Sequence, residues 1–166
     1  MLRLLYIAPV ILYVSLATCL AAIGRSPDAG SVSAVAILHW ESPHAFYAFT
    51  LKRDGTITLI GTHFGLKAGA YTTKLSAAAF RRVAEQAEEC NFMGLSSNYR
   101  QSNWKGGYTK FRVITGLEQK AIEVGARSME TAPSGLTELE ATIEEVAPRT
   151  GWHYLGGLGD GTPAPW

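Results

Sequence analysis

The spacing of apolar residues changes along this chain from alternation to helical periodicity, returns to alternation, and ends in a second helical stretch. Alternation is typical of strands that bury one face, and helical spacing is typical of helices that bury one stripe. The alternating segments are Val32–Trp40, Ala45–Lys52, Thr56–Gly61, Ala70–Leu75, Tyr108–Thr115 and Gln119–Val124. This order predicts an α+β fold: an antiparallel sheet built from two hairpin units with two helices packed on one face.

Two further segments carry apolar residues at three- and four-residue spacing. The first helix is expected to begin after Ser76, whose hydroxyl suits an N-cap, and to end near Cys90. Pro133 opens the second helix, and Pro148 ends it because proline lacks the amide hydrogen that a helix interior needs. The predicted buried stripes are Phe80, Val83, Ala84 and Ala87 in the first helix, and Leu136, Leu139, Ile143 and Val146 in the second.

Asp54-Gly55 is the strongest local signal in the chain. An Asp-Gly pair accommodates the positive φ angles of a two-residue hairpin turn, so the segments on either side of it are expected to pair. In the register of that turn, His63 lies near Phe46 on the neighbouring strand.

The N-terminal residues predict export. A basic start, an apolar run over Leu4–Ile23 and a small-residue exit at Gly24 are typical of a signal peptide, so residues 1–24 are interpreted as a cleaved signal. Two alternatives stay open: an uncut anchor, because the apolar run is long enough to span a bilayer, and a lipoprotein acylated at Cys19. The expected location is therefore exported, periplasmic or secreted, or else membrane-anchored by residues 4–23.

The rest of the chain divides into a spacer, a domain and a tail. Residues 25–31 are read as a polar spacer, and residues 32–154 as a single α+β domain. Residues 155–166 are rich in Gly and Pro and hold too few apolar groups to offset the entropy lost on ordering, which predicts a flexible tail.

Charge and cysteine content limit the partners. The formal net charge is +1, from 15 Lys and Arg against 14 Asp and Glu, which gives no reason to expect nucleic acid as a partner. Membrane contact is expected only through the N-terminal segment, if it stays uncut. Cys90 is the one cysteine outside that segment, so no intrachain disulfide forms, and a buried inert thiol is the preferred interpretation.

A polar loop carries the residues most suited to binding. Aromatic and cationic side chains together suit contact with a protein, a peptide or a glycan of the envelope. The candidate binding residues are Tyr99, Arg100, Trp104, Lys105 and Tyr108. The alternative is that one or two of these aromatics cap the open face of the sheet.

Histidines supply the other candidate chemistry. His39, His44 and His63 are weak candidates for a metal site together with Glu41, because the H-x-E-x-x-H spacing fits no helical zinc motif and Pro43 prevents a helix. We expect no metal and no other cofactor. No complete nucleophile or acid–base set is visible, so no catalytic residue is assigned. The leading interpretation is a non-catalytic binding or interaction module; the alternative is a hydrolase or metal-assisted enzyme that uses this cluster.

Residues at the joints between these elements also carry a resemblance. They are Tyr47, Leu51, Asp54-Gly55, Gly69, Phe92, Leu95, Tyr99, Ala132-Pro133, Leu136, Leu139-Glu140, Ile143 and Trp152. In this order and spacing, the stretch from about Val35 to Trp152 resembles the bacterial domain-of-unknown-function family numbered 6438. The resemblance implies the fold and a location in the envelope, and it implies no activity.

The chain departs from that family at one place. Many members carry Cys-x-Gly-x-Cys-Pro just before the tyrosine, whereas Trp40, Ser42, His44 and Ala45 stand at those places here. Any disulfide or ligand role of the paired cysteines is therefore absent from this chain.

Overall fold

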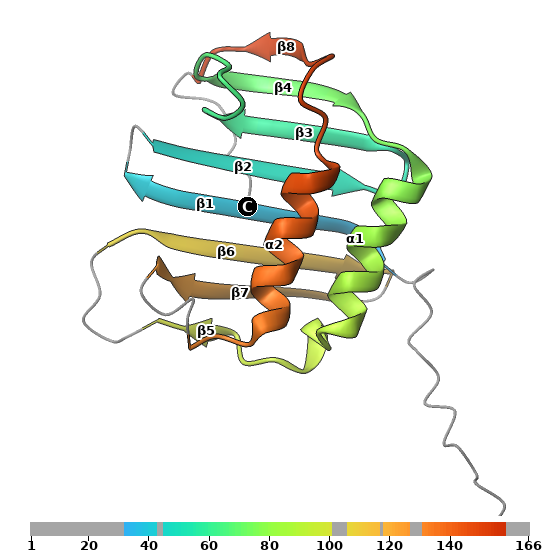
Figure 1. Cartoon of the computed structure of the whole chain (residues 1–166), viewed down its shortest axis with the longest axis vertical. Helices are drawn as coiled ribbons and strands as arrows, with labels where there is room; N and C mark the ends of the chain where they lie inside the picture. The colour runs from blue at the N-terminus through green and yellow to red at the C-terminus, as the bar shows by residue number, and fades with distance from the viewer. Residues whose placement is uncertain (1–31, 43–44, 101–105, 117, 127–130, 159–166) are drawn as a thin grey trace, which may run out of the picture.

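The computed structural model describes residues 32–42, 45–100, 106–116, 118–126 and 131–158, which form one eight-stranded sheet and two helices (Figure 1). The strands are β1 (Val32–Ser42), β2 (Ala45–Lys52), β3 (Thr56–Gly61), β4 (Gly69–Lys74), β5 (Asn98–Tyr99), β6 (Tyr108–Thr115), β7 (Gln119–Gly125) and β8 (His153–Gly156). The helices are α1 (Ala77–Glu89) and α2 (Ser134–Val146), with a short 3-10 turn at Phe92–Gly94. The strand order across the sheet is β5-β7-β6-β1-β2-β3-β4-β8.

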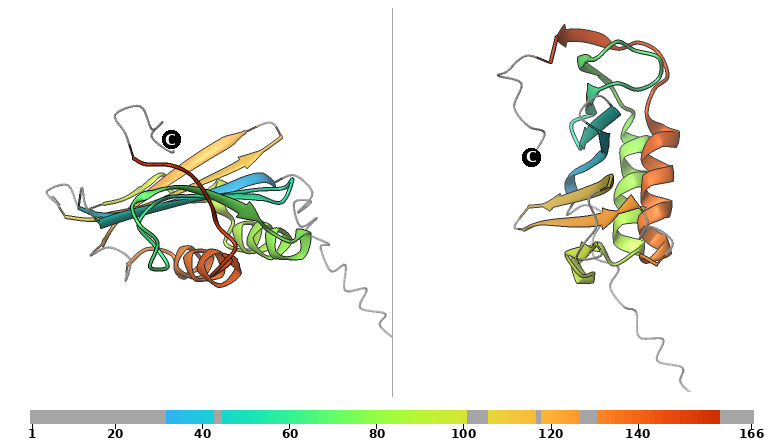
Figure 2. Two further views of the ribbon diagram at one scale, coloured as in Figure 1. Left: turned by 90° about the horizontal axis from the view of Figure 1, so that it is seen from above. Right: turned by 90° about the vertical axis from the view of Figure 1, so that its left-hand side faces the viewer.

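Both helices lie side by side against the same face of the sheet, as Figure 2 shows. The predicted α+β class is therefore confirmed. Every second residue along each strand points into the layer between the sheet and the helices, and these side chains form the core. Its largest fully buried side chains include Phe49, Phe92, Phe111, Ile37, Leu51, Ile57, Leu59, Ile122, Leu136, Leu139 and Ile143.

The expectation of a purely antiparallel sheet is wrong, because β5 runs parallel to β7. β5 pairs Asn98 with Glu123 and Tyr99 with Val124, and the amide of Glu123 also donates to the carbonyl of Ser97 at 3.0 Å. A strand of two residues has no apolar alternation, so this edge gave no signal in the sequence.

The β2–β3 hairpin forms as expected, but its loop and register differ from the prediction. Tyr47 pairs with Gly61 and Leu51 with Ile57, which leaves a three-residue loop over Arg53–Gly55 instead of a two-residue turn. Gly55 takes the left-handed conformation at φ 78°, as in three-residue hairpins that end in a bulge. The amide of Thr62 donates to the carbonyl of Phe46, so His63 lies one position beyond the place predicted for it.

The helix boundaries follow the capping signals. The Ser76 hydroxyl accepts from the amide of Ala79 at 3.1 Å, and Pro133 precedes the first residue of α2. Between the helices, Arg82 on α1 pairs with Glu145 on α2 at 2.9 Å. A Cβ atom at Gly135 would overlap Cys90, so glycine allows the two helix ends to approach closely.

The predicted signal peptide, and the alternatives of an uncut anchor or a lipidated Cys19, concern residues 1–31, which lie outside the described residues. Among those that are described, no helix is long and apolar enough to cross a membrane. At the other end, β8 covers His153–Gly156, a strand that was not predicted and that reaches into the segment read as tail.

Candidate functional site

Three of the five predicted binding residues are described by the structure: Tyr99, Arg100 and Tyr108. The guanidinium of Arg100 lies 5.5 Å from the centre of the Tyr108 ring and forms an ion pair with Glu123. Tyr108 in turn stacks on Trp40, with ring centres 5.4 Å apart and planes inclined by 24°. We name Trp40, Arg100, Tyr108 and Glu123 the open-face cluster.

The open-face cluster lies on the side of the sheet away from the helices. Trp40 pairs directly with Tyr108, and it alternates along β1 with Ile37 and His39, which point toward the helices. Sequence reasoning missed Trp40 as a member of this group. Trp40 can be recognised only through its cross-strand pairing with Tyr108, and that pairing can be found only when the strand register is known.

Tyr99 belongs to a different environment from Tyr108. Its ring packs against the hydrophobic core, and its hydroxyl accepts from the amide of Ser96 at 3.1 Å. Tyr99 therefore packs with the core and is not a member of the open-face cluster. Trp104 and Lys105 fall outside the described residues.

A second group of polar residues lies on the helix-facing side, at the end of the sheet where β1 finishes and β2 begins. His39 from β1, Tyr47 from β2 and His63 after β3 form a stack of three rings. The ring centres of His39 and Tyr47 are 5.3 Å apart with planes inclined by 13°, and those of Tyr47 and His63 are 4.2 Å apart. We name these three residues the ring stack.

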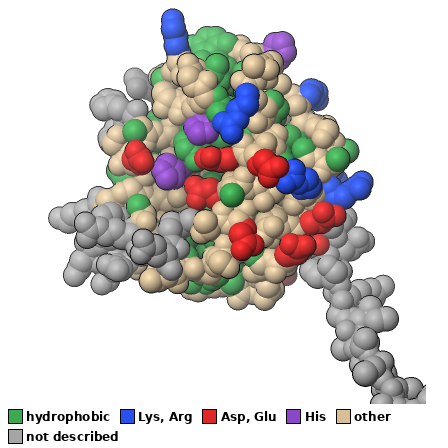
Figure 3. Space-filling view, in the orientation of Figure 1, with side chains coloured by type: hydrophobic (Ala, Val, Ile, Leu, Met, Phe, Trp, Pro, Cys, Tyr) green, Lys and Arg blue, Asp and Glu red, His purple; other side chains and the backbone are tan. Residues whose placement is uncertain are grey.

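Carboxylates surround the ring stack. Oε1 of Glu140 on α2 lies 3.5 Å from Nδ1 of His39, and Oε1 of Glu41 lies 3.5 Å from its Nε2. The Tyr47 hydroxyl donates to Oε1 of Glu144 at 2.5 Å. Figure 3 shows histidine side chains among acidic ones on this side of the molecule.

The two histidines of the ring stack differ in electrostatics. The contact with Glu140 raises the pKa of His39, against the opposing effect of burial. Burial lowers the pKa of His63, and Arg149 lowers it further, while Glu144 acts in the opposite direction. Nε2 of His63 is buried without a hydrogen-bond partner, 3.9 Å from Glu144. Two imidazoles in one cluster therefore favour opposite protonation states.

A pocket of about 190 Å³ opens beside the ring stack. It is lined by His39, Glu41, Ala45, Phe46, Tyr47 and Thr62. An imidazole held by a carboxylate and facing a pocket is the arrangement of a general base. Of the two hydroxyls in the lining, that of Thr62 donates to the carbonyl of Phe46 at 3.5 Å and that of Tyr47 donates to Glu144, so neither is paired with His39 as a nucleophile. No three His, Cys, Asp or Glu side chains of the described chain converge as metal ligands, and His44 lies outside that part.

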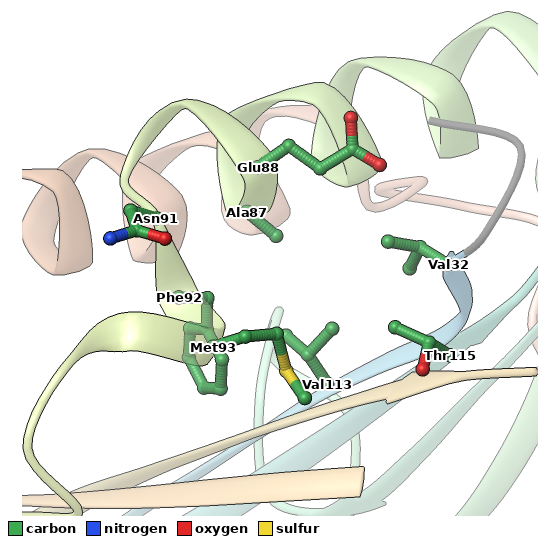
Figure 4. Close-up of a pocket in the computed structure, with 8 residues that line it drawn as sticks. All are labelled: Val32, Ala87, Glu88, Asn91, Phe92, Met93, Val113 and Thr115. Carbon is green, nitrogen blue, oxygen red and sulfur yellow. The ribbon is translucent and has the colours of Figure 1, made fainter. Parts of the chain in front are cut away.

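A second pocket, of about 120 Å³, lies at the other end of the helix layer (Figure 4). It is lined by Val32, Ala87, Glu88, Asn91, Phe92, Met93, Val113 and Thr115. These side chains come from β1, β6, the C-terminal end of α1 and the 3-10 turn that follows it, and they are mainly apolar, so the pocket offers packing surface and no acid–base pair.

No curated protein matches this chain. A family model described as domain of unknown function DUF6438 matches residues 45–147, which span the sheet from β2 to β7, both helices and most of the ring stack. Because the match covers more than half of the sequence, the chain belongs to the DUF6438 family.

Proposed function

We propose that this domain is an exported, non-catalytic binding module of the cell envelope that holds a protein or peptide against the open-face cluster. The observation that carries the proposal is the stack of Trp40 on Tyr108, with Arg100 over the same ring, on the sheet face that α1 and α2 leave uncovered. Trp, Tyr and Arg are the residues most enriched at the energetic centres of protein interfaces.

The composition of the open face supports a protein or peptide partner. Ala36, Leu38 and Ala48 lie on the same face as Trp40 but are buried, so the accessible apolar part of this face is formed by the half-buried rings of Trp40 and Tyr108. Arg100 and Glu123 at its margin provide hydrogen-bonding groups of both signs. An apolar centre with a polar rim is the usual composition of such an interface.

Export is the part of the proposal that rests on the sequence. The apolar run over Leu4–Ile23 with its small-residue exit supports a signal peptide, and an uncut anchor or a lipid on Cys19 would hold the domain at a membrane. Mass spectrometry of the envelope fraction distinguishes these forms: a chain that begins after Gly24 supports cleavage, an intact Met1 supports the anchor, and a diacylglycerol on Cys19 supports the lipoprotein.

Capture from envelope extract tests the binding function. The bait is the chain from Arg25 onward, beside the variants Trp40→Ala and Arg100→Ala. We expect the wild type to retain a discrete protein and each variant to bind it about 10- to 100-fold more weakly. The matched controls are Tyr154→Ala and Arg82→Ala, which remove an exposed aromatic and an exposed arginine elsewhere.

Two results would contradict this proposal. Equal retention by all five baits would place the interface elsewhere on the molecule. Elution of the bound material as carbohydrate, with no protein retained, would replace the protein partner by a glycan.

An enzyme is the second candidate, because His39 lies between two carboxylates beside a pocket. In this alternative His39 acts as a general base on water, Glu140 orients it, and Glu41 lines the substrate side. A metal-assisted variant adds His44 and His63. Turnover of a panel of ester and amide substrates that is lost in His39→Gln supports the enzyme, and near-stoichiometric zinc that is lost in His44→Ala supports the metal.

A further inference from the structure

α2 meets the sheet through two kinds of contact. Leu136, Leu139 and Ile143 are fully buried in the apolar core. Glu140 and Glu144, one helical turn apart, instead meet the ring stack, which comes from three neighbouring parts of the sheet. The second half of α2 is therefore joined to the sheet through ionisable groups as well as through apolar packing.

We propose that the ring stack and the two glutamates of α2 form a pH-sensitive latch, which holds the second half of α2 against the sheet near pH 6.5 and loosens it in both more acidic and more alkaline solution. The latch concerns the helix-facing side and is independent of the binding surface proposed above.

His39 sets the pH above which the latch loosens. It faces Glu140 from α2, Glu41 from its own strand, Tyr47 from β2 and the Thr109 hydroxyl of β6, whose oxygen lies 3.1 Å from Nδ1. Its pKa is raised by Glu140, so the folded protein binds the proton more tightly than the unfolded chain. This stabilising contact is fully present below the ordinary pKa of about 6.5 and is lost as the pH rises through the raised pKa.

His63 sets the pH below which the latch loosens. It faces Glu144 from α2, Arg149 from the segment after α2, His39, and the rings of Tyr47 and two phenylalanines. Its pKa is lowered, chiefly by burial, so the unfolded chain binds the proton more tightly than the folded protein. The contribution of neutral His63 is present above pH of about 6.5 and is lost as the pH falls through the lowered pKa.

Tyr47 connects the two histidines without titrating itself. Burial and the hydrogen bond to Glu144 raise its pKa, so its hydroxyl stays a donor throughout the range in which the histidines change charge. Tyr47→Phe keeps the ring and removes this donor. The variant is therefore expected to weaken the latch at every pH alike, without changing the position of either limit.

Hydrogen exchange of the full chain at pH 5.0, 6.5 and 8.5 tests the latch. Protection of the α2 amides is compared with that of the β1 and β2 amides in the same sample, which cancels the intrinsic effect of pH on exchange. We expect the α2 protection of the wild type, relative to those strands, to be highest at pH 6.5 and to fall about threefold or more on each side.

The variants separate the two limits. His39→Gln is expected to abolish only the alkaline fall, and His63→Gln only the acidic fall, while His153→Gln on the exposed edge strand serves as the matched control and changes neither. Glu140→Gln removes the charged partner of His39 from the helix surface without leaving a cavity. It is expected to abolish the alkaline fall as well, which covers the case in which a histidine variant fails to fold.

Three outcomes overturn the proposal. The first is wild-type α2 protection that does not depend on pH once it is referred to β1 and β2. The second is an equal change in α2 and the strands, which would mean that the histidines act only on global stability. The third is loss of both falls in His153→Gln.

Discussion

At the scale of single residues, glycines set the geometry beneath the ring stack. Gly61, the cross-strand partner of Tyr47, has φ 113°, a conformation that L-residues rarely adopt. A Cβ atom there would overlap the carbonyl oxygen of Phe46, and this backbone is fixed by its hydrogen bond to Thr62. The close approach of β2 and β3 at this point therefore requires glycine.

Gly61→Ala is expected to destabilise the domain by about 1–3 kcal/mol, through backbone strain and displacement of Phe46. The control is Gly116→Ala, where nothing lies within 4 Å of the added Cβ and φ is not in the left-handed region. Denaturant unfolding of both variants measures the difference. Equal stability of the two would show that β3 can adjust around residue 61 without cost.

The candidate residues were only partly accessible from the sequence. Arg100 and Tyr108 were recognised from their composition, but Trp40 joins them through a strand pairing that is not local in the chain. The relation of His39 to Glu140 has the same character, since about a hundred residues separate them. Residue types that suit chemistry can be found from sequence, whereas their convergence depends on the fold.

At the scale of elements, helices and long strands were predictable and edges were not. The stripes of α1 and α2 and their caps follow from local signals, and both helices form where those signals lie. The short strands β5 and β8 carry no alternation, so only pairing with neighbours reveals them. Edge strands this short depend on the sheet they join.

The register of the β2–β3 hairpin is set by core burial and not by the preference of its turn residues. The Asp-Gly pair suggested a two-residue turn, but that register would place Phe49 opposite Ile60 and turn Ile57 and Leu59 away from the core. The observed pairs, Phe49 with Leu59 and Leu51 with Ile57, keep all four side chains in the core. Burial of apolar side chains therefore outweighs the turn preference, and the loop grows by one residue.

Leu139→Ala or Ile143→Ala in α2 is expected to cost about 2–5 kcal/mol, because each fully buried side chain would leave a cavity between helix and sheet. Glu145→Ala on the exposed side of the same helix is the control, since its ion pair with Arg82 lies at the surface. Chemical denaturation reports the free energies of unfolding. Wild-type stability of both core variants would mean that this stripe packs against nothing essential.

At the scale of the whole molecule, the sheet has two chemically different faces. The helix-facing side buries the core and ends in the ring stack with its glutamates, whereas the other side presents stacked aromatics and an arginine. Because alternate residues along a strand point to opposite faces, His39 and Trp40 serve different sides although they are neighbours in the chain. One strand thus contributes to both regions.

Folding is expected to be independent of redox conditions. Cys90 is the one cysteine in the described chain, its thiol donates to the carbonyl of Ala87 at 3.3 Å, and burial raises its pKa. A thiol that stays protonated reacts slowly. The melting temperature of the chain from Arg25 onward should be the same with and without reductant; a large drop on reduction would indicate an intermolecular disulfide.

The most direct test of the account is site-specific photo-crosslinking of the full chain in the cells that produce it. A photoreactive phenylalanine analogue replaces Tyr108 in the open-face cluster or, as a control, Arg82 on the exposed surface of α1. The account predicts a discrete cross-linked protein from position 108 and none from position 82. The same product from position 82 alone, or no product from either position, would contradict a binding surface on the open face.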